Sequence, residues 1–166
     1  RTLRFGDKTA AEALTPRVHV EAILLDATVG DLYDKATQSG HSHYPVYGSD
    51  LDDIRGVVTI IDLFELPTSE RRTTPVVDIM REPIVIPETR HLVDVLDDFR
   101  SSGAELVIVV DEHGGTAGII TLEDVLEEIT GDIDDEYDRE GPLTVMRAGV
   151  SVVAGTSSAD EVLDAT

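Results

Sequence analysis

Two short stretches of the sequence carry residues suited to binding phosphate and ribose. Residues 59–62 and 121–124 share a Thr-x-x-Asp pattern, and each follows a glycine and two apolar residues. A threonine at the start of a helix lies beside backbone N–H groups that have no partner within the helix, and these groups attract anions. Its hydroxyl can donate to a phosphate oxygen, and the aspartate one turn later can accept from ribose hydroxyls. Ordinary N-capping without a ligand is the alternative interpretation.

Histidines are the other residues that could do chemistry. His41 and His43 would point to the same side of a strand, where two imidazoles can chelate zinc. No third ligand stands at a suitable spacing, and the sequence has no cysteine. It also lacks the Gly-x-Ser-x-Gly elbow of hydrolases and the Gly-x-x-x-x-Gly-Lys-Ser/Thr phosphate loop. We therefore do not expect an enzyme.

The charge of the chain restricts its partners. The formal net charge is −21, from 34 acidic and 13 basic residues. A field of that sign repels nucleic acid and favours cations. Either the acidic surface is simply solvated, or some carboxylates bind Mg²⁺. The longest aliphatic run, residues 106–110, is far shorter than the roughly 20 residues of a membrane helix.

An internal repeat organises the chain. Residues 56–63 resemble residues 118–125 at an offset of 62. Each copy predicts a short extended segment, a helix, two strands and a second helix, in the order β-α-β-β-α. The first helices are expected to start near the capping residues Thr28 and Thr89 and to end at Gly40 and Gly103. The second helices are expected to start at Thr59 and Thr121.

The boundaries follow from this repeat. We expect a lead-in at residues 1–8, a first repeat at 9–66, a polar linker at 67–75 bounded by prolines and a second repeat at 76–131. Residues 132–142 are strongly acidic and are expected to form an exposed connector. Residues 143–166 read as a hairpin leading into a helix, the truncated start of a further domain.

Three stretches resemble a known family. Residues 40–46 and 56–62 are similar to a CBS motif, and residues 109–129 look very like the second CBS domain of CorC/CNNM proteins, which are also called hemolysin-like. The resemblance covers about residues 8–140. It implies an α+β fold in which the two β-α-β-β-α repeats pack as a pseudo-twofold pair. It also implies ATP or AMP bound between the repeats, often with Mg²⁺, and a homodimer. An upstream membrane domain would transport Mg²⁺, so this chain would lie on the cytoplasmic face.

The resemblance also assigns site residues. The family's nucleotide contacts correspond to Thr15, His41, Ser42, His43, Tyr44, Pro45, Ile120, Thr121 and Asp124. Many relatives carry arginine where this chain has His43. Arginine offers a permanent two-pronged donor to phosphate, whereas an unperturbed histidine is mostly neutral above about pH 6.5. We therefore expect weaker nucleotide binding, which His43→Arg should strengthen.

A second, mirror-related site would use Thr59 and Asp62 with Glu105. The Glu105 carboxylate would repel a phosphate unless a cation lay between them. One competent nucleotide site per chain is therefore expected. Two other functions stay open at this stage, a ligand-free structural or dimerisation module and a direct sensor of Mg²⁺.

Overall fold

The computed structural model describes the backbone of residues 4–140 and the side chains of residues 4–134. The expected further domain at residues 143–166 lies outside the described residues. The seven strands that it describes are β1 (Thr15–Pro16), β2 (Ile23–Leu24), β3 (His43–Tyr47), β4 (Ile54–Thr59), β5 (Val85–Pro87), β6 (Leu106–Val110) and β7 (Thr116–Thr121). The α-helices are α1 (Ala10–Ala13), α2 (Val29–Ser39), α3 (Leu92–Ser102) and α4 (Leu122–Glu140). Four 3-10 helices join them, η1 (Phe5–Asp7), η2 (Arg17–His19), η3 (Ile60–Glu65) and η4 (Val76–Asp78).

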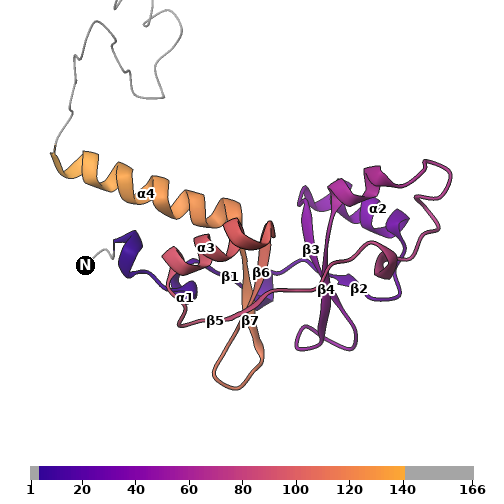
Figure 1. Ribbon diagram of the computed structural model, residues 1–166, viewed down its shortest axis with the longest axis horizontal. Coiled ribbons are helices and arrows are strands. Elements are labelled where there is room, and N and C mark those ends of the chain that lie inside the picture. Colours follow the sequence, from indigo (N-terminus) through magenta and orange to yellow (C-terminus); the bar gives the residue numbers. More distant parts are fainter. Residues whose placement is uncertain (1–3, 141–166) are drawn as a thin grey trace, which may run out of the picture. The chain divides into compact units, whose positions relative to one another are not determined.

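The predicted order β-α-β-β-α is present twice, which confirms the fold class (Figure 1). The first repeat is β2-α2-β3-β4-η3 and the second is β5-α3-β6-β7-α4. In each repeat the first strand runs parallel to the second, and the second and third form an antiparallel hairpin. As expected, α2 and α3 end at Gly40 and Gly103, whose φ angles of 77° and 72° are left-handed.

The last helices of the two repeats differ in length. The first, η3, has six residues and ends before Pro67, which disfavours helical geometry at the residue before it. The second, α4, has 19 residues and continues through Glu140. The acidic segment that we expected to form an exposed connector is helical through Glu140, and no proline interrupts it before Pro142.

Each repeat is completed by the segment that precedes the other repeat. We call the residues before the first strand of each repeat its lead segment. Strand β1 lies in the lead segment of the first repeat but pairs with β7 of the second, Thr15 opposite Ile119. Arg81 precedes the second repeat but pairs with Val57 of β4, through two N–H···O bonds of 2.9 Å. The exchange is reciprocal, as a pseudo-twofold pair requires. A sequence repeat is therefore not the same thing as a folded half of the molecule.

The helices α2 and α3 begin in different ways, and the exchange contributes to the start of α3. Thr28 forms a capping box with Asp31 at the start of α2, as predicted. Helix α3 instead begins after His91 without a side-chain cap, so the expected cap at Thr89 is wrong. Its first N–H donates to the carbonyl of Lys8, 2.9 Å away, from the segment before the first repeat. A backbone carbonyl from a distant segment therefore satisfies the start of α3, in place of the threonine side chain.

Two glycines allow the exchanged segments to approach. A Cβ on Gly118 would lie 2.0 Å from the carbonyl oxygen of Thr15, and one on Gly56 would lie 2.9 Å from that of Arg81. Both distances are shorter than real Cβ contacts. The glycine before each Thr-x-x-Asp pattern is thus needed for strand pairing.

Three apolar clusters hold the fold. One core belongs to the second sheet and includes Ala10 from the lead segment. Another core belongs to the first sheet and includes Val76 of η4, which follows the linker. A third lies between the two sheets, where Leu106, Ile108 and Ile119 pack against Val20, Ile54 and Val57.

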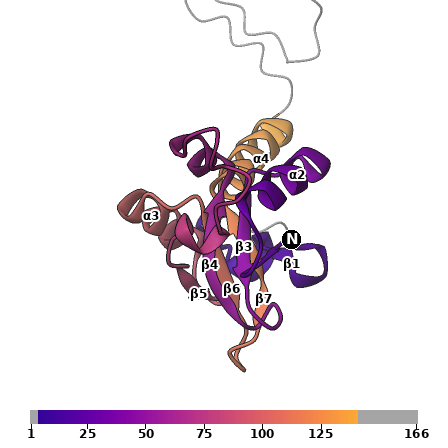
Figure 2. The same cartoon turned by 90° about the vertical axis from the view of Figure 1, so that its right-hand side faces the viewer.

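A polar contact joins the tips of the two hairpins, which lie at the end away from α2 in both views (Figure 2). The Asp52 carboxylate accepts from Arg17 at 2.5 Å and from the backbone N–H of Thr116 at 2.9 Å. The hydrogen bond from Arg17, followed by that from Thr116, lowers the pKa of Asp52.

Candidate functional site

Two pockets of similar size, about 190 and 220 Å³, lie between the repeats. We name them after their threonines. The Thr121 pocket gathers six of the nine residues predicted for the main site, namely Thr15, His41, Ser42, His43, Thr121 and Asp124. These residues come from β1, from the segment after α2 with the first residue of β3, and from the junction of β7 and α4. Segments far apart in the sequence thus meet in one place.

The start of α4 sets the geometry of the Thr121 pocket. The backbone N–H of Thr121 donates to Asp124 Oδ2 at 2.9 Å, and the backbone N–H of Asp124 donates to Thr121 Oγ1 at 3.2 Å. This closed capping box is the alternative interpretation of the motif, and it is present. It does not exhaust either side chain, since the threonine hydroxyl can still donate and the carboxylate can still accept. Capping and ligand binding are therefore compatible here.

Three predicted contacts lie elsewhere. Tyr44 is fully buried in the core of the first sheet, and its hydroxyl bonds Ser39 Oγ and the carbonyl of His41. Pro45 is buried beside it on β3, and Ile120 is fully buried in the core of the second sheet. Because side chains alternate along a strand, the neighbours His43 and Ile119 face the pocket instead.

Six lining residues were not predicted, namely His19, Val20, Glu21, Ile119, Glu123 and Glu127. Glu123 and Glu127 could have been found together from the sequence, because they are four residues apart and so share one face of the helix that begins after Thr121. No comparable signal marks residues 19–21, which reach the pocket through the exchanged lead segment.

The Thr121 pocket is acidic. Glu21, Glu123, Asp124 and Glu127 line it, and no lysine or arginine is among its described lining residues. The negative charge of Glu21 is offset in part by Lys35, whose Nζ lies 3.0 Å from the Glu21 carboxylate. The hydrogen bond from Lys35 lowers the pKa of Glu21. His19, His41 and His43 supply imidazole groups to the lining, beside the hydroxyls of its threonines and serine. A bare polyphosphate would meet repulsion here.

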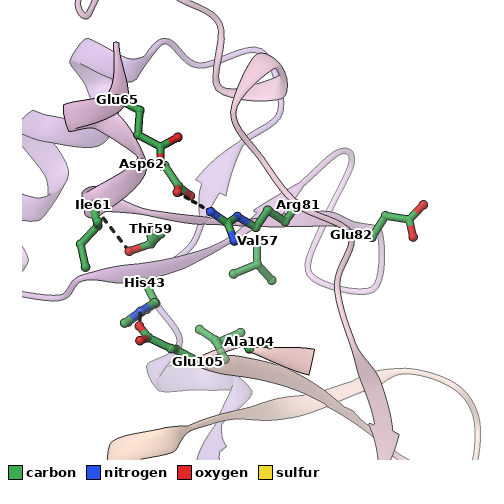
Figure 3. A pocket seen from close by; sticks show the side chains of 12 residues that line it. His43, Val57, Thr59, Ile61, Asp62, Glu65, Arg81, Glu82, Ala104 and Glu105 are labelled. Carbon is green, nitrogen blue, oxygen red and sulfur yellow. Dashed lines mark hydrogen bonds and ion pairs between the residues drawn. The ribbon is translucent and has the colours of Figure 1, made fainter. Parts of the chain in front are cut away.

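The Thr59 pocket is the mirror-related site, and it contains all three of the residues predicted for it, Thr59, Asp62 and Glu105 (Figure 3). Its pseudo-symmetry is broken by Arg81, whose Nη2 lies 2.8 Å from Asp62 Oδ1. Arg81 was missed, although it stands before the second repeat much as Thr15 stands before the first.

His43 lines both pockets. Its Nε2 lies 2.5 Å from the carboxylate of Glu105, and the two residues are 62 positions apart. His43 pairs with Thr59 as Leu106 pairs with Thr121, so Glu105 stands one residue before the equivalent of His43, and the two side chains meet where the two copies face each other. The Glu105 carboxylate, which we expect to repel a phosphate at this site, is in contact with His43.

Within residues 4–134 no group of three or more histidine, aspartate or glutamate side chains is arranged to hold a metal ion. None of the helices in the described part of the chain is long and apolar enough to cross a membrane.

Known proteins share this architecture. The family model described as "CBS domain" matches residues 11–68 and 76–131. The CBS domain of a bacterial CNNM/CorC family Mg²⁺ transporter, solved in complex with ATP, superposes with a TM-score of 0.72 at 38% identity. That match covers 76% of this chain and 90% of the other. This chain therefore belongs to the CBS domain family, as a tandem pair of the CorC/CNNM type.

Two curated relatives extend beyond it. A UPF0053 protein of Mycobacterium tuberculosis is 40% identical over all 166 residues, which are 36% of the relative. The magnesium and cobalt efflux protein CorC of Escherichia coli is 34% identical over 81% of this chain and 46% of its own length. The chain thus spans less than half of these relatives. The matched family is a regulatory module and not a class of enzymes.

Proposed function

We propose that this CBS pair binds an adenine nucleotide, ATP or AMP, in the Thr121 pocket and regulates a membrane transport domain of the same protein. The observation that carries the proposal is the convergence of Thr15, residues 41–43 and residues 121–124 on one pocket at a helix start. The ATP complex of a similar CBS domain supports it. We propose no catalytic step for this chain.

The acidic lining points to the form of the ligand. ATP would bring a polyphosphate next to Glu123, Asp124 and Glu127, without a permanent cation among the described lining residues. A Mg²⁺ ion bound to the phosphates would remove most of that repulsion. The pocket therefore binds ATP as the Mg²⁺ complex, in which the phosphates of the nucleotide hold the ion.

The mechanism is a shift between arrangements of the two repeats. A bound nucleotide would contact the lead segment at Thr15, the first repeat at His43 and the second at Thr121. It stabilises only those arrangements in which all three lie close together. Thr15 lies on the N-terminal side of the first repeat. A change in the arrangement of the repeats would therefore be transmitted to a membrane domain joined on that side. In this proposal the chain works on the cytoplasmic face of the membrane.

We also propose that the module works as a homodimer. Phe64 of η3 and Leu126 of α4 are equivalent in the repeat, and both are well exposed, at 63% and 49%. Tyr33 on α2 and Val93 on α3 add further exposed apolar surface on helices. Burying such side chains between two copies is favourable. Sedimentation of the native chain and of Phe64→Glu tests this proposal: we expect a dimer in the native chain and a monomer in the variant. A dimer in both proteins, or in neither, would contradict a dimer interface that includes Phe64.

Thermal unfolding tests nucleotide binding. ATP, ADP, AMP and GTP are each added with and without Mg²⁺. A ligand at 100 times its Kd stabilises the folded state by about 2.7 kcal/mol, which is roughly 5–10 °C for a chain of this size. We expect MgATP or AMP to produce such a shift and Thr121→Val with Asp124→Asn to abolish it. Glu70→Gln, an exposed substitution in the linker, is the control.

The other outcomes separate the rival functions. No shift with any nucleotide at millimolar concentration would leave a structural module. A shift with Mg²⁺ alone, unchanged by added nucleotide, would indicate a direct Mg²⁺ sensor.

A further inference from the structure

We propose that the Thr59 pocket is a separate binding site for a small organic cation, an aliphatic molecule that carries protonated amines. The proposal starts from Asp62. Its side chain is 6% exposed, and its Oδ1 accepts from Arg81 at 2.8 Å. Its Oδ2 is buried and has no hydrogen-bond partner within the described part of the chain. Leaving a buried acceptor of this kind unpaired is unfavourable, and more so for a charged group.

The equivalent aspartate of the second repeat shows what is unusual. Asp124 turns its Oδ2 back to the N–H of Thr121 and closes a capping box. Thr59 instead accepts from the N–H of Ile61 at 3.4 Å, and the carboxylate of Asp62 is directed toward Arg81 (Figure 3). Asp62 thus has no capping role and lies in the lining of the pocket with one carboxylate oxygen that has no donor within the described part of the chain.

The charges around Asp62 decide which donor fits. Glu65, Glu82 and Glu105 also line the pocket, against a single arginine. Arg81 already serves Oδ1, and its own side chain is 69% exposed. A phosphate would add negative charge to four carboxylates, whereas an ammonium group would reduce the repulsion among them and supply the missing N–H.

The remaining walls suit the rest of such a molecule. Val57, Ile61, Ala104 and Leu106 form apolar lining between the acidic groups. Methylene groups can bury against this surface while ammonium ends reach the carboxylates, as lysine side chains do on proteins. The pocket therefore favours an alkyl diamine or polyamine over a nucleotide. This inference does not depend on nucleotide binding in the Thr121 pocket.

Calorimetry with putrescine at about 0.15 M salt tests it, since that ionic strength screens loose attraction to the surface. We expect one binding event per chain in the native protein. Asp62→Asn should weaken it by about tenfold or more, because the charge-assisted hydrogen bond is lost. Glu70→Gln removes one exposed charge from the linker and should leave the affinity within about twofold.

A second variant guards against misfolding of Asp62→Asn. Ala104→Leu fills the apolar wall without touching Asp62 and should also weaken putrescine binding, whereas Thr121→Val should not affect it. Lack of binding heat at millimolar putrescine would overturn the proposal. So would equal weakening by Asp62→Asn and Glu70→Gln, which would indicate a diffuse counterion. A nucleotide result of either sign leaves these outcomes unchanged.

Discussion

His43 is the residue on which the nucleotide proposal turns. It lines both pockets and holds Glu105 at 2.5 Å across the two copies. An arginine there would keep a permanent charge and could contact both Glu105 and a phosphate. We expect His43→Arg to lower the Kd for MgATP by about tenfold, the scale of one hydrogen bond to a charged group, as measured by calorimetry.

His113→Arg is the matched control, because it adds the same charge on an exposed hairpin residue whose side chain is 84% accessible. If both variants bind equally well, general electrostatic attraction explains the gain. Unchanged binding in His43→Arg would remove this residue from the phosphate contacts.

At the scale of elements, the closest approach lies between β1 and β7. A methyl group at Gly118 would lie 2.0 Å from the carbonyl oxygen of Thr15, so Gly118→Ala must push the strands apart. We expect a loss of roughly 1–3 kcal/mol in the free energy of unfolding, measured in urea. The nucleotide shift should fall as well, since β1 carries Thr15 into the pocket.

Gly131→Ala provides the comparison. Nothing lies within 4 Å of a Cβ at this helical position. Alanine there should leave stability unchanged or raise it by up to about 1 kcal/mol. Similar stabilities for the two variants would show that β1 tolerates displacement.

The contact between the hairpin tips gives the fold a dependence on pH. The pKa of Asp52 is lowered by Arg17 and Thr116, so the folded state favours the ionised carboxylate. Its contribution is complete above the unfolded pKa of about 3.9 and is lost as the pH falls through the lower folded value. Asp52→Asn should therefore lower the Tm at pH 7 and have no such effect near pH 2. A difference between the two proteins that persists at pH 2 would contradict this account.

The sequence predicts the elements better than their partners. The 62-residue offset correctly predicts two β-α-β-β-α units, and the positions of Gly40 and Gly103 predict where α2 and α3 end. The exchange of lead segments has no such signal, because it is made by backbone groups such as the carbonyl of Lys8. The failed cap at Thr89 has the same cause.

The site was predictable to the extent that it lies on repeated motifs. Thr121 and Asp124 line the pocket, at the place where their motif opens a helix directly after a strand. Tyr44 and Ile120 were misplaced by one residue along strands, where one step reverses the face. Arg81 lay in a segment whose resemblance to the first copy was too loose to assign a role.

At the scale of the whole molecule, the two repeats share an interior. Ile108 is 1% exposed and packs in the cluster between the sheets. Ile108→Ala should cost roughly 2–5 kcal/mol and should destabilise both repeats together. Three of the four tyrosines, Tyr33, Tyr44 and Tyr47, lie in the first repeat, so their fluorescence reports that repeat, while circular dichroism reports the whole chain.

We expect the two signals to give one urea midpoint in the native chain and one lower midpoint in Ile108→Ala. Val93→Ala, on an exposed position of α3, should move neither appreciably. Separate midpoints for tyrosine fluorescence and circular dichroism would show that the repeats unfold independently.

The reciprocal exchange of lead segments has a consequence for the covalent chain itself. A protease cut near Ser69 would leave one fragment carrying β1 in the second sheet and the other carrying Arg81 in the first. Neither fragment could leave without opening a sheet of its partner, so the nicked halves should co-elute in gel filtration and separate only in denaturant. The linker is thus a position where the polypeptide can be interrupted, or a foreign sequence inserted, while the two clasped halves stay together, as in a split reporter.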